Sequence, residues 1–402
     1  MEMKAFIVDG VRSPIGSFGG ALKSVRADDL AAHSLSSLIS KFKSLDLELV
    51  ADIYMGCANQ AGEDNRNVAR MAALLAGIPP SVPAETINRL CASGLSAVLH
   101  AQRAIHAGAG EFFIAGGVES MTRAPYVISK AGRAFGTDSK MYDSSFGWRF
   151  VNSRMKSMYG TEAMGETAEN LVEQYSISRE DQDAFALWSQ MKTLSAAEKG
   201  FFQQEISPVA IAQRKAEDTI VKGDEFPKPK TSLEGLAKLK PAFRNPGSVT
   251  AGNSSGLNDG SCAILMASEQ GLLTINADPL ARVVCGASVG VEPRTMGIGP
   301  VLASEKALKM AGLKLKDMDI IEINEAFSAQ VLSCTRAMGL DDRDPRINPN
   351  GGSISLGHPL GMTGARLALT AAKELQRSAG RYALVTMCIG VGQGFAVILE
   401  RH

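Results

Sequence analysis

The chain has 402 residues, with 42 acidic and 42 basic side chains and a formal net charge of zero. This balance argues against a nucleic-acid surface and against an acidic tail. The length predicts two or three domains with a sizeable core.

Six cysteines in so long a chain do not make a disulfide scaffold, and no C-x-x-C spacing indicates a zinc site. With no signal-peptide pattern at the N-terminus, they indicate a reducing compartment, and we expect a cytoplasmic protein. They are Cys57, Cys91, Cys262, Cys285, Cys334 and Cys388.

Strands and helices alternate over the first 120 residues, which predicts an α/β fold with at least some parallel strands. A strand at 53–55 leads to a helix at 68–76, and a short strand at 83–88 leads to a helix that ends at Gly108. A further strand ends in glycines near residue 117.

Cys91 lies where the strand at 83–88 turns into the following helix, in the run Asn88-Arg89-Leu90-Cys91-Ala92-Ser93-Gly94. The N–H groups and the dipole at a helix start favour a thiolate, which is the nucleophilic form, and can hold an oxyanion. A small buried apolar side chain is the ordinary alternative for a lone cysteine.

From about Met121 to Asn258 the sequence is richer in Lys, Arg, Tyr and Met, with helices expected at 166–174 and 180–199. We interpret this region as an insertion that carries binding surface. Its last part, 250–260, is a loop of small residues without the lysine of a P-loop, wide enough for a narrow ligand arm.

The last third resumes the alternation. A helix at 304–311 precedes a strand that ends at Asn324, and a glycine-rich turn with His358 precedes a helix at 364–376. The apolar run 383–399 contains three glycines, so we expect a hairpin and no membrane span.

The two halves have the same order of features. In each, a strand leads to a turn with a reactive residue, Cys91 or His358, and then to a helix and a strand that ends in glycines. A duplicated α/β unit would bring corresponding turns together, with Asn324 and Cys388 beside them.

Each of the other candidates has an ordinary alternative. His358 suits a general base, and otherwise is a loop histidine. Cys388 suits proton transfer beside a Gly390 N–H that points at an oxyanion, and otherwise is a core thiol. Asn324 suits the orientation of a water or carbonyl, and otherwise is a turn residue.

The candidates lie in four short motifs, NRLCASG at 88–94, NEAF at 324–327, GHP at 357–359 and CIG at 388–390. Three further stretches are GCANQAGEDNRNVAR at 56–70, GWRF at 147–150 and DQDAFA at 181–186. Through the four motifs the sequence resembles the thiolase family over the whole chain. Through the three further stretches it most closely resembles the degradative branch of 3-oxoadipyl-CoA thiolases.

The resemblance implies a role for each catalytic candidate. Cys91 would be acylated, His358 would activate it and later deprotonate CoA, and Cys388 would protonate the departing acetyl-CoA carbanion. One oxyanion hole would combine Asn324, through a water, with His358, and the other would use the Cys91 and Gly390 N–H groups.

The same resemblance implies binding residues. Ser255 and Ala251 would line the pantetheine path, with Lys228 near the CoA nucleotide. Met164, Met296 and Phe327 would line the acyl pocket. CoA would be a co-substrate, with no permanently bound cofactor, no metal and no contact with nucleic acid or membrane.

The implied fold is a pair of duplicated α/β halves in α-β-α-β-α layers. We expect an N-terminal half at 1–123, completed by about 259–279, an inserted loop domain at 124–258 that binds CoA and substrate, and a C-terminal half at 280–402. A homodimer or homotetramer is expected.

The activity expected is cleavage of a 3-oxoacyl-CoA, favoured 3-oxoadipyl-CoA, to acetyl-CoA and a shortened acyl-CoA. An acetoacetyl-CoA thiolase is one alternative, weakened by Ala163 where biosynthetic members usually have histidine. A decarboxylating ketoacyl synthase and a non-catalytic lipid carrier are two others. An adipyl tail needs a cation, and Arg66, Arg123 and Arg149 are equal candidates.

Overall fold

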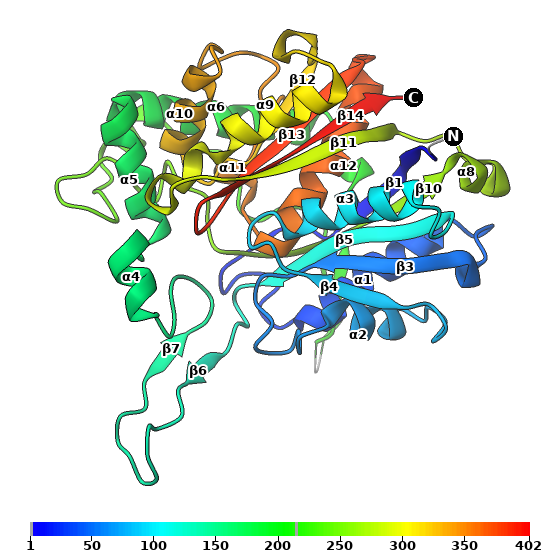
Figure 1. Cartoon of the computed structure of the whole chain (residues 1–402), viewed down its shortest axis with the longest axis horizontal. Coiled ribbons are helices and arrows are strands. Elements are labelled where there is room, and N and C mark those ends of the chain that lie inside the picture. The colour runs from blue at the N-terminus through cyan, green and yellow to red at the C-terminus, as the bar shows by residue number, and fades with distance from the viewer. Residues whose placement is uncertain (1–2, 214–215) are drawn as a thin grey trace.

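The described residues, 3–213 and 216–402 of a computed structural model, are built around one ten-stranded mixed sheet (Figure 1). Residues 1, 2, 214 and 215, which fall within the expected N-terminal half and insertion, lie outside the described residues. The order across the sheet is β12 (Ile320–Ile323), β13 (Tyr382–Ile389), β14 (Gln393–Arg401), β11 (Ala281–Gly290), β1 (Ala5–Arg12), β10 (Asn258–Ser268), β5 (Phe112–Ser120), β3 (Val50–Gly56) and β4 (Ala84–Ile87), with β2 (Gly16–Ser17) beside β10.

The sheet consists of two halves joined by a short seam, where Phe6 and Ile7 of β1 pair with Arg282 and Ala281 of β11. β3 is parallel to β4 and β5 in one half, as β12 is to β13 in the other. The expected hairpin at 383–399 is confirmed, because β13 and β14 pair antiparallel.

Helices cover both halves and separate them. They are α1 (Ala27–Lys41), α2 (Val68–Leu75), α3 (Ser93–His106), α8 (Glu269–Ile275), α9 (Gly299–Ala311), α10 (Ser328–Ala337), α11 (Ser353–Leu356) and α12 (Leu360–Ser378), with 3-10 turns at Leu47–Leu49, Pro293–Ile298 and Leu315–Asp317.

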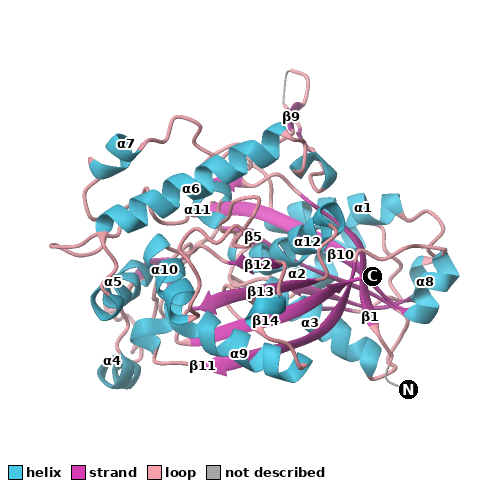
Figure 2. Ribbon diagram, turned by 90° about the horizontal axis from the view of Figure 1, so that it is seen from above, coloured by secondary structure: helices cyan, strands magenta, loops and turns pink. Residues whose placement is uncertain are grey.

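α3 and α12 pack together in the core cluster that joins the two halves of the sheet. α12 is buried nearly all round, as a helix between two layers must be. α1 and α2 pack on the outer face of one half, and α9 and α10 on the outer face of the other (Figure 1). Seen from above, the long helix α6 (Arg179–Glu198) lies beside α11 (Figure 2). The expected layered α-β-α-β-α fold is confirmed.

The chain between β5 and β10 lies outside the large sheet and includes the long helix α6. In Figure 1 its first part projects from the body as a narrow arm. Its elements are β6 (Tyr126–Ile128), β7 (Met141–Asp143), α4 (Ser153–Tyr159), α5 (Met164–Tyr175), α6 (Arg179–Glu198), a 3-10 turn at Phe202–Gln204, β8 (Val209–Ile211), β9 (Thr219–Val221) and α7 (Leu233–Ala237).

Two expectations about the second half were wrong in detail. The turn with His358 does not follow a strand. An isolated bridge between Ile321 and Ile347 stands in its place, followed by the short helix α11. α12 begins at Leu360 and not at 364, because Pro359 can precede the first helical turn without losing a hydrogen bond there. No helix in the described ranges is long and apolar enough to span a membrane.

Candidate active site

Cys91 lies in a strained turn between β4 and α3. Leu90 adopts a positive φ of 47°, which residues other than glycine rarely adopt. Val391, in the turn after Cys388, also has a positive φ, of 66°. Both residues line the same cavity as Cys91, so the strain is concentrated at one place, as is common at functional sites.

The cavity has a volume of about 300 Å³ and opens beside Cys91. Leu90, Met164 and Gly390 line it next to the cysteine, and a loop of the insertion closes another side. The loop residues that line it are Ser144, Ser145, Phe146, Gly147, Trp148 and Arg149.

The two cysteines of the site are close enough to influence one another, since the Cys91 sulfur raises the pKa of Cys388. The Gly390 N–H donates to the Cys91 sulfur. Cys388 is buried at the end of β13, and burial is the main reason that its pKa lies well above the ordinary value. It is therefore a thiol at neutral pH, able to give a proton.

The expected thiolate at Cys91 is corrected by its surroundings. Burial raises the pKa of Cys91 to about 11, and the N–H donors at the turn lower it only in part. Removing a charge from water costs more than these two hydrogen bonds return. Cys91 in the free protein is a thiol, and it needs a base.

The tautomer of His358 leaves its ring able to accept a proton. Its Nδ1 lies 2.7 Å from Thr363 Oγ1, and the Thr363 hydroxyl donates its only proton to the Pro359 carbonyl, at 2.8 Å. The threonine oxygen must then accept from Nδ1–H, which leaves Nε2 without a proton. Burial lowers the pKa of His358 to about 3, so the ring is neutral.

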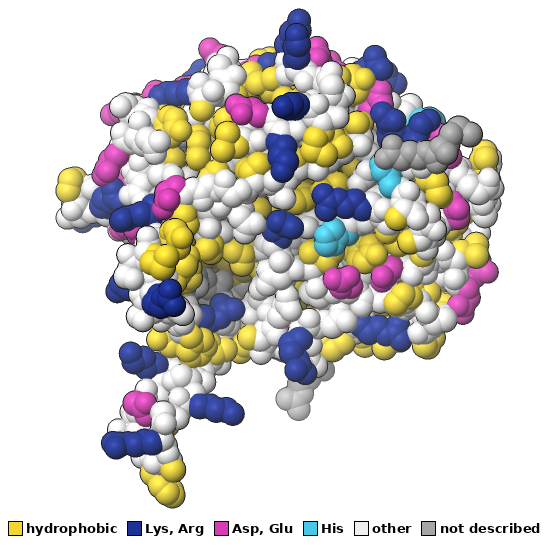
Figure 3. Space-filling view, viewed as in Figure 1, with side chains coloured by type: hydrophobic (Ala, Val, Ile, Leu, Met, Phe, Trp, Pro, Cys, Tyr) yellow, Lys and Arg dark blue, Asp and Glu magenta, His cyan; other side chains and the backbone are white. Residues whose placement is uncertain are grey.

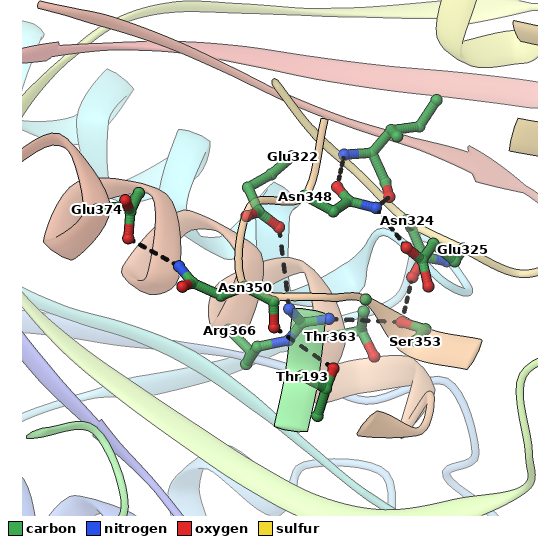
Figure 4. Close-up of polar contacts among 12 residues, drawn as sticks. Thr193, Glu322, Asn324, Glu325, Asn348, Asn350, Ser353, Thr363, Arg366 and Glu374 are labelled. Carbon is green, nitrogen blue, oxygen red and sulfur yellow. Dashed lines mark hydrogen bonds and ion pairs between the residues drawn. The ribbon is translucent and has the colours of Figure 1, made fainter. Parts of the chain in front are cut away.

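Asn324 contacts the free ring nitrogen. Its Nδ2 lies 3.3 Å from His358 Nε2, and its Oδ1 accepts from Ser353 Oγ at 2.7 Å. Arg366 donates to Ser353 Oγ at 3.4 Å and lies 4.0 Å from the Glu322 carboxylate (Figure 4). Because arginine can only donate, the Ser353 hydroxyl accepts from Arg366 and donates to Asn324 Oδ1. Asn324 Nδ2 is then left to donate to His358 Nε2, so the orientation of the Asn324 amide is fixed.

The backbone connects His358 to both sulfurs. Asn324 follows β12, and its N–H donates to the Thr386 carbonyl of β13, two residues before Cys388. His358 N–H donates to Asn258 Oδ1 at 2.9 Å, which fixes the turn to the start of β10. Cys91, Asn324, His358, Cys388 and Gly390 therefore belong to one contiguous set of contacts.

The remaining predicted residues divide between two places. Lys228 and Ala251 line a second cavity of about 300 Å³ with Lys230 and Gly235. Ser255 lies beside the acyl-pocket candidates, because its N–H donates to Ala326 and Ser254 forms a bridge with Phe327.

Of the three acyl-pocket candidates, only Met164 lines the cavity at Cys91. Met296 and Phe327 are buried in an apolar cluster that also contains Cys388. They pack behind the cavity, on the side of the second thiol.

Sequence reasoning missed four residues of this site. Thr363 had one usable signal, its position one turn after His358. Ser353 and Arg366 form the hydrogen bonds behind Asn324, and Asn258 fixes the His358 turn from 100 residues away. No local pattern reports such contacts, because they depend on how separate turns pack.

The sequence matches two family models, described as "Thiolase, N-terminal domain" over residues 5–270 and "Thiolase, C-terminal domain" over residues 277–401. A 3-oxoadipyl-CoA/3-oxo-5,6-dehydrosuberyl-CoA thiolase of Escherichia coli is 58% identical over 99% of both chains. A beta-ketoadipyl-CoA thiolase of Acinetobacter baylyi is 55% identical, again over 99% of both.

Among solved structures, the Bacillus anthracis acetyl-CoA acetyltransferase has a TM-score of 0.92 and 40% identity, and the match covers 100% of this chain and 99% of that one. The resemblance seen in the motifs around Cys91, Asn324, His358 and Cys388 thus extends over the full length and to the fold. The chain belongs to the thiolase family.

Proposed function

We propose that this thiolase cleaves 3-oxoadipyl-CoA with CoA, giving acetyl-CoA and a shortened acyl-CoA. The proposal is supported by one set of contacts, which links Cys91 on the wall of a cavity to Cys388 and to a His358 ring that can accept a proton. The substrate is supported by the printed activity of relatives that are 58% and 55% identical over 99% of the chain.

In the proposed reaction His358 takes the proton of Cys91 as the sulfur attacks the 3-oxo carbon. The bond between the second and third carbons then breaks, and Cys388 protonates the departing acetyl-CoA carbanion. The proton held by His358 then passes to the Cys388 thiolate, which restores a neutral ring. His358 next deprotonates CoA, the CoA thiolate attacks the acyl carbonyl, and Cys91 leaves and recovers the proton from His358. This chemistry needs a base, a thiol acid and two oxyanion sites, and it needs no redox group.

The N–H groups of Cys91 and Gly390 are proposed as one oxyanion hole, and Asn324 with His358 as the other. The fixed direction of the Asn324 amide supports the second, because its N–H is held toward the site. No group of three or more metal-ligating side chains occurs among the residues that the structure describes.

CoA is proposed to bind as a co-substrate along Ser255, Ala251 and Lys228, which is supported by the second cavity and its lysines. Met164 is proposed to line the acyl pocket, with Met296 and Phe327 behind it. The expected division at residues 123, 258 and 280 is kept as the domain proposal, since the insertion carries Lys228 and Ala251.

A homodimer or homotetramer and a cytoplasmic location remain part of the proposal. The assembly is supported by an exposed apolar arm, described in the Discussion, and the location by six cysteines that all remain free thiols.

A thiolysis panel tests the function. Purified protein is given CoA with 3-oxoadipyl-CoA, 3-oxooctanoyl-CoA or acetoacetyl-CoA, and acetyl-CoA release is measured. We expect the highest kcat/KM with 3-oxoadipyl-CoA. Cys91→Ser should lower it more than about 1000-fold, whereas Cys285→Ser, outside the site, should not change it.

Preference for acetoacetyl-CoA would move the assignment to the acetyltransferase alternative. No acetyl-CoA from any member of the panel would reject thiolysis and favour the carrier. Mass spectrometry of Cys91 after exposure to acetyl-CoA separates these two cases, because only the enzyme forms the acetyl adduct.

A further inference from the structure

Among the residues that the structure describes, one cationic side chain lines the cavity beside Cys91, that of Arg149. The other two arginine candidates are elsewhere. Arg123 is held by the Glu63 carboxylate, with its Nε 2.7 Å from Oε2, and Arg66 has an exposed side chain; neither lines the cavity.

Arg149 keeps most of its donors available. Among the described residues its side chain makes a single hydrogen bond, from Nη1 to the Ser144 carbonyl at 3.2 Å, and no Asp or Glu there forms an ion pair with it. A guanidinium with open donors on the wall of a cavity is suited to a carboxylate, which it can bind through two parallel hydrogen bonds.

The loop that presents Arg149 is built into the body of the protein. Ser144 is buried, its Oγ donates to the Pro125 carbonyl at 2.6 Å, and it accepts from Asn59 Nδ2 at 3.1 Å. Trp148, directly before Arg149 in the chain, donates from its indole to the Glu162 carbonyl at 3.2 Å. Arg149 is thus positioned by the anchored Trp148 directly before it and by its own hydrogen bond to the Ser144 carbonyl.

One carboxylate, that of Glu119, lines the described wall of this cavity, and it does not compete for Arg149. Glu119 is buried, and its two oxygens accept the N–H groups of Ala58, Asn59 and Gly361 at 2.8 to 2.9 Å. It is turned toward the backbone, and the rest of the wall near Cys91 is largely apolar.

We propose that Arg149 binds the terminal carboxylate of a dicarboxylic 3-oxoacyl-CoA, and so selects such substrates over uncharged acyl chains of the same length. The proposal deepens the proposed function and rests on it. Cys91 holds the reacting end of the chain in this cavity, and Arg149 receives the far end.

The test compares two substrates that differ only at that end. 3-Oxoadipyl-CoA and 3-oxohexanoyl-CoA both have six acyl carbons, and only the first ends in a carboxylate. Arg149→Met should lower kcat/KM for 3-oxoadipyl-CoA by about 100-fold and change it for 3-oxohexanoyl-CoA less than about threefold. Arg149→Lys should fall between Met and wild type for 3-oxoadipyl-CoA, because charge remains and the paired geometry is lost.

Arg66→Met is the matched control, an arginine outside the cavity, and should alter neither substrate. The acetyl adduct at Cys91, formed from acetyl-CoA, checks that each variant is folded, since an acetyl group has no far carboxylate. Equal loss on both substrates would show that Arg149 holds CoA or the loop, and unchanged kinetics would show that it binds nothing; either result overturns the inference. If wild type does not cleave 3-oxoadipyl-CoA at all, it is the proposed function that fails.

Discussion

At the scale of single residues, the Cys91 thiol and the His358 ring are both uncharged in the free protein. Burial puts the Cys91 pKa at about 11 and the His358 pKa at about 3, on opposite sides of neutrality and in the directions that disfavour an ion pair. The proton must therefore move during attack. A thiolase arranged in this way does not keep a reactive thiolate waiting for its substrate.

This arrangement predicts the pH dependence of Cys91 alkylation. Only the thiolate reacts, and its fraction rises tenfold per pH unit until the pKa is reached. Iodoacetamide should therefore modify Cys91 about 100-fold faster at pH 8 than at pH 6, with no plateau below pH 9. Peptide mass spectrometry at each pH gives the rate. A plateau reached below pH 7 would indicate a thiolate–imidazolium pair and contradict the prediction.

At the scale of elements, the site depends on how closely two helix starts approach. A Cβ at Gly94 of α3 would lie 2.5 Å from the carbonyl oxygen of Gly361 in α12. A Cβ at Gly361 would collide with the carbonyls of Gly56 and Val118, and one at Gly364 with the backbone of Leu95. Glycine at these places lets the first turns of α3 and α12 touch, and each turn follows a catalytic candidate.

Gly361→Ala tests this packing. The added methyl would overlap backbone carbonyls that cannot rotate away, so we expect a loss of about 1–3 kcal/mol in the free energy of unfolding and a lower kcat. Thermal unfolding and the thiolysis assay measure the two effects. Gly223→Ala, in a loop where a Cβ meets nothing within 4 Å, is the control. If Gly361→Ala were as stable and active as wild type, the close approach would not be required.

The same elements show how far the sequence could predict the structure. Periodicity located α3, α5, α6 and the β13–β14 hairpin, because each buries a face of regular spacing. The prediction of a strand before His358 was wrong. The turn there is fixed by hydrogen bonds to Asn258 and Thr363 and needs no strand to hold it.

The local signal at Cys91 located the nucleophile candidate and misjudged its charge. Helix-start geometry can be read from a sequence, whereas the burial that raises the pKa of Cys91 depends on how other elements pack around its sulfur. For the same reason the sequence could not select Arg149 among the three arginine candidates, because the selection depends on which loop folds over the cavity.

At the scale of the whole molecule, the arm between β5 and α4 exposes several large apolar side chains to solvent. It stands away from the body and carries apolar side chains to its tip (Figure 3). Phe135 is fully exposed, and Tyr126, Ile128 and Met141 are 63–70% exposed. Monomeric proteins rarely expose so much apolar surface together. We therefore expect the arm to pack against a second copy of the chain in the proposed homodimer or homotetramer.

The assembly prediction follows from that exposure. Phe135→Asp with Met141→Asp places two charges where the arm would pack against another copy, and we expect the molar mass from light scattering to fall to a smaller assembly. Folding of the body should be unaffected, because Phe135 is fully exposed and Met141 is 63% exposed, and thermal unfolding checks this. Leu273→Asp, at a side chain on α8 that is 75% exposed, is the matched control and should leave the mass unchanged.

Since Cys91 and His358 lie in one chain, acetyl transfer to Cys91 should survive in the smaller species. A mass equal to that of wild type would mean that the arm holds no subunit contact, and the assembly would have to use another face.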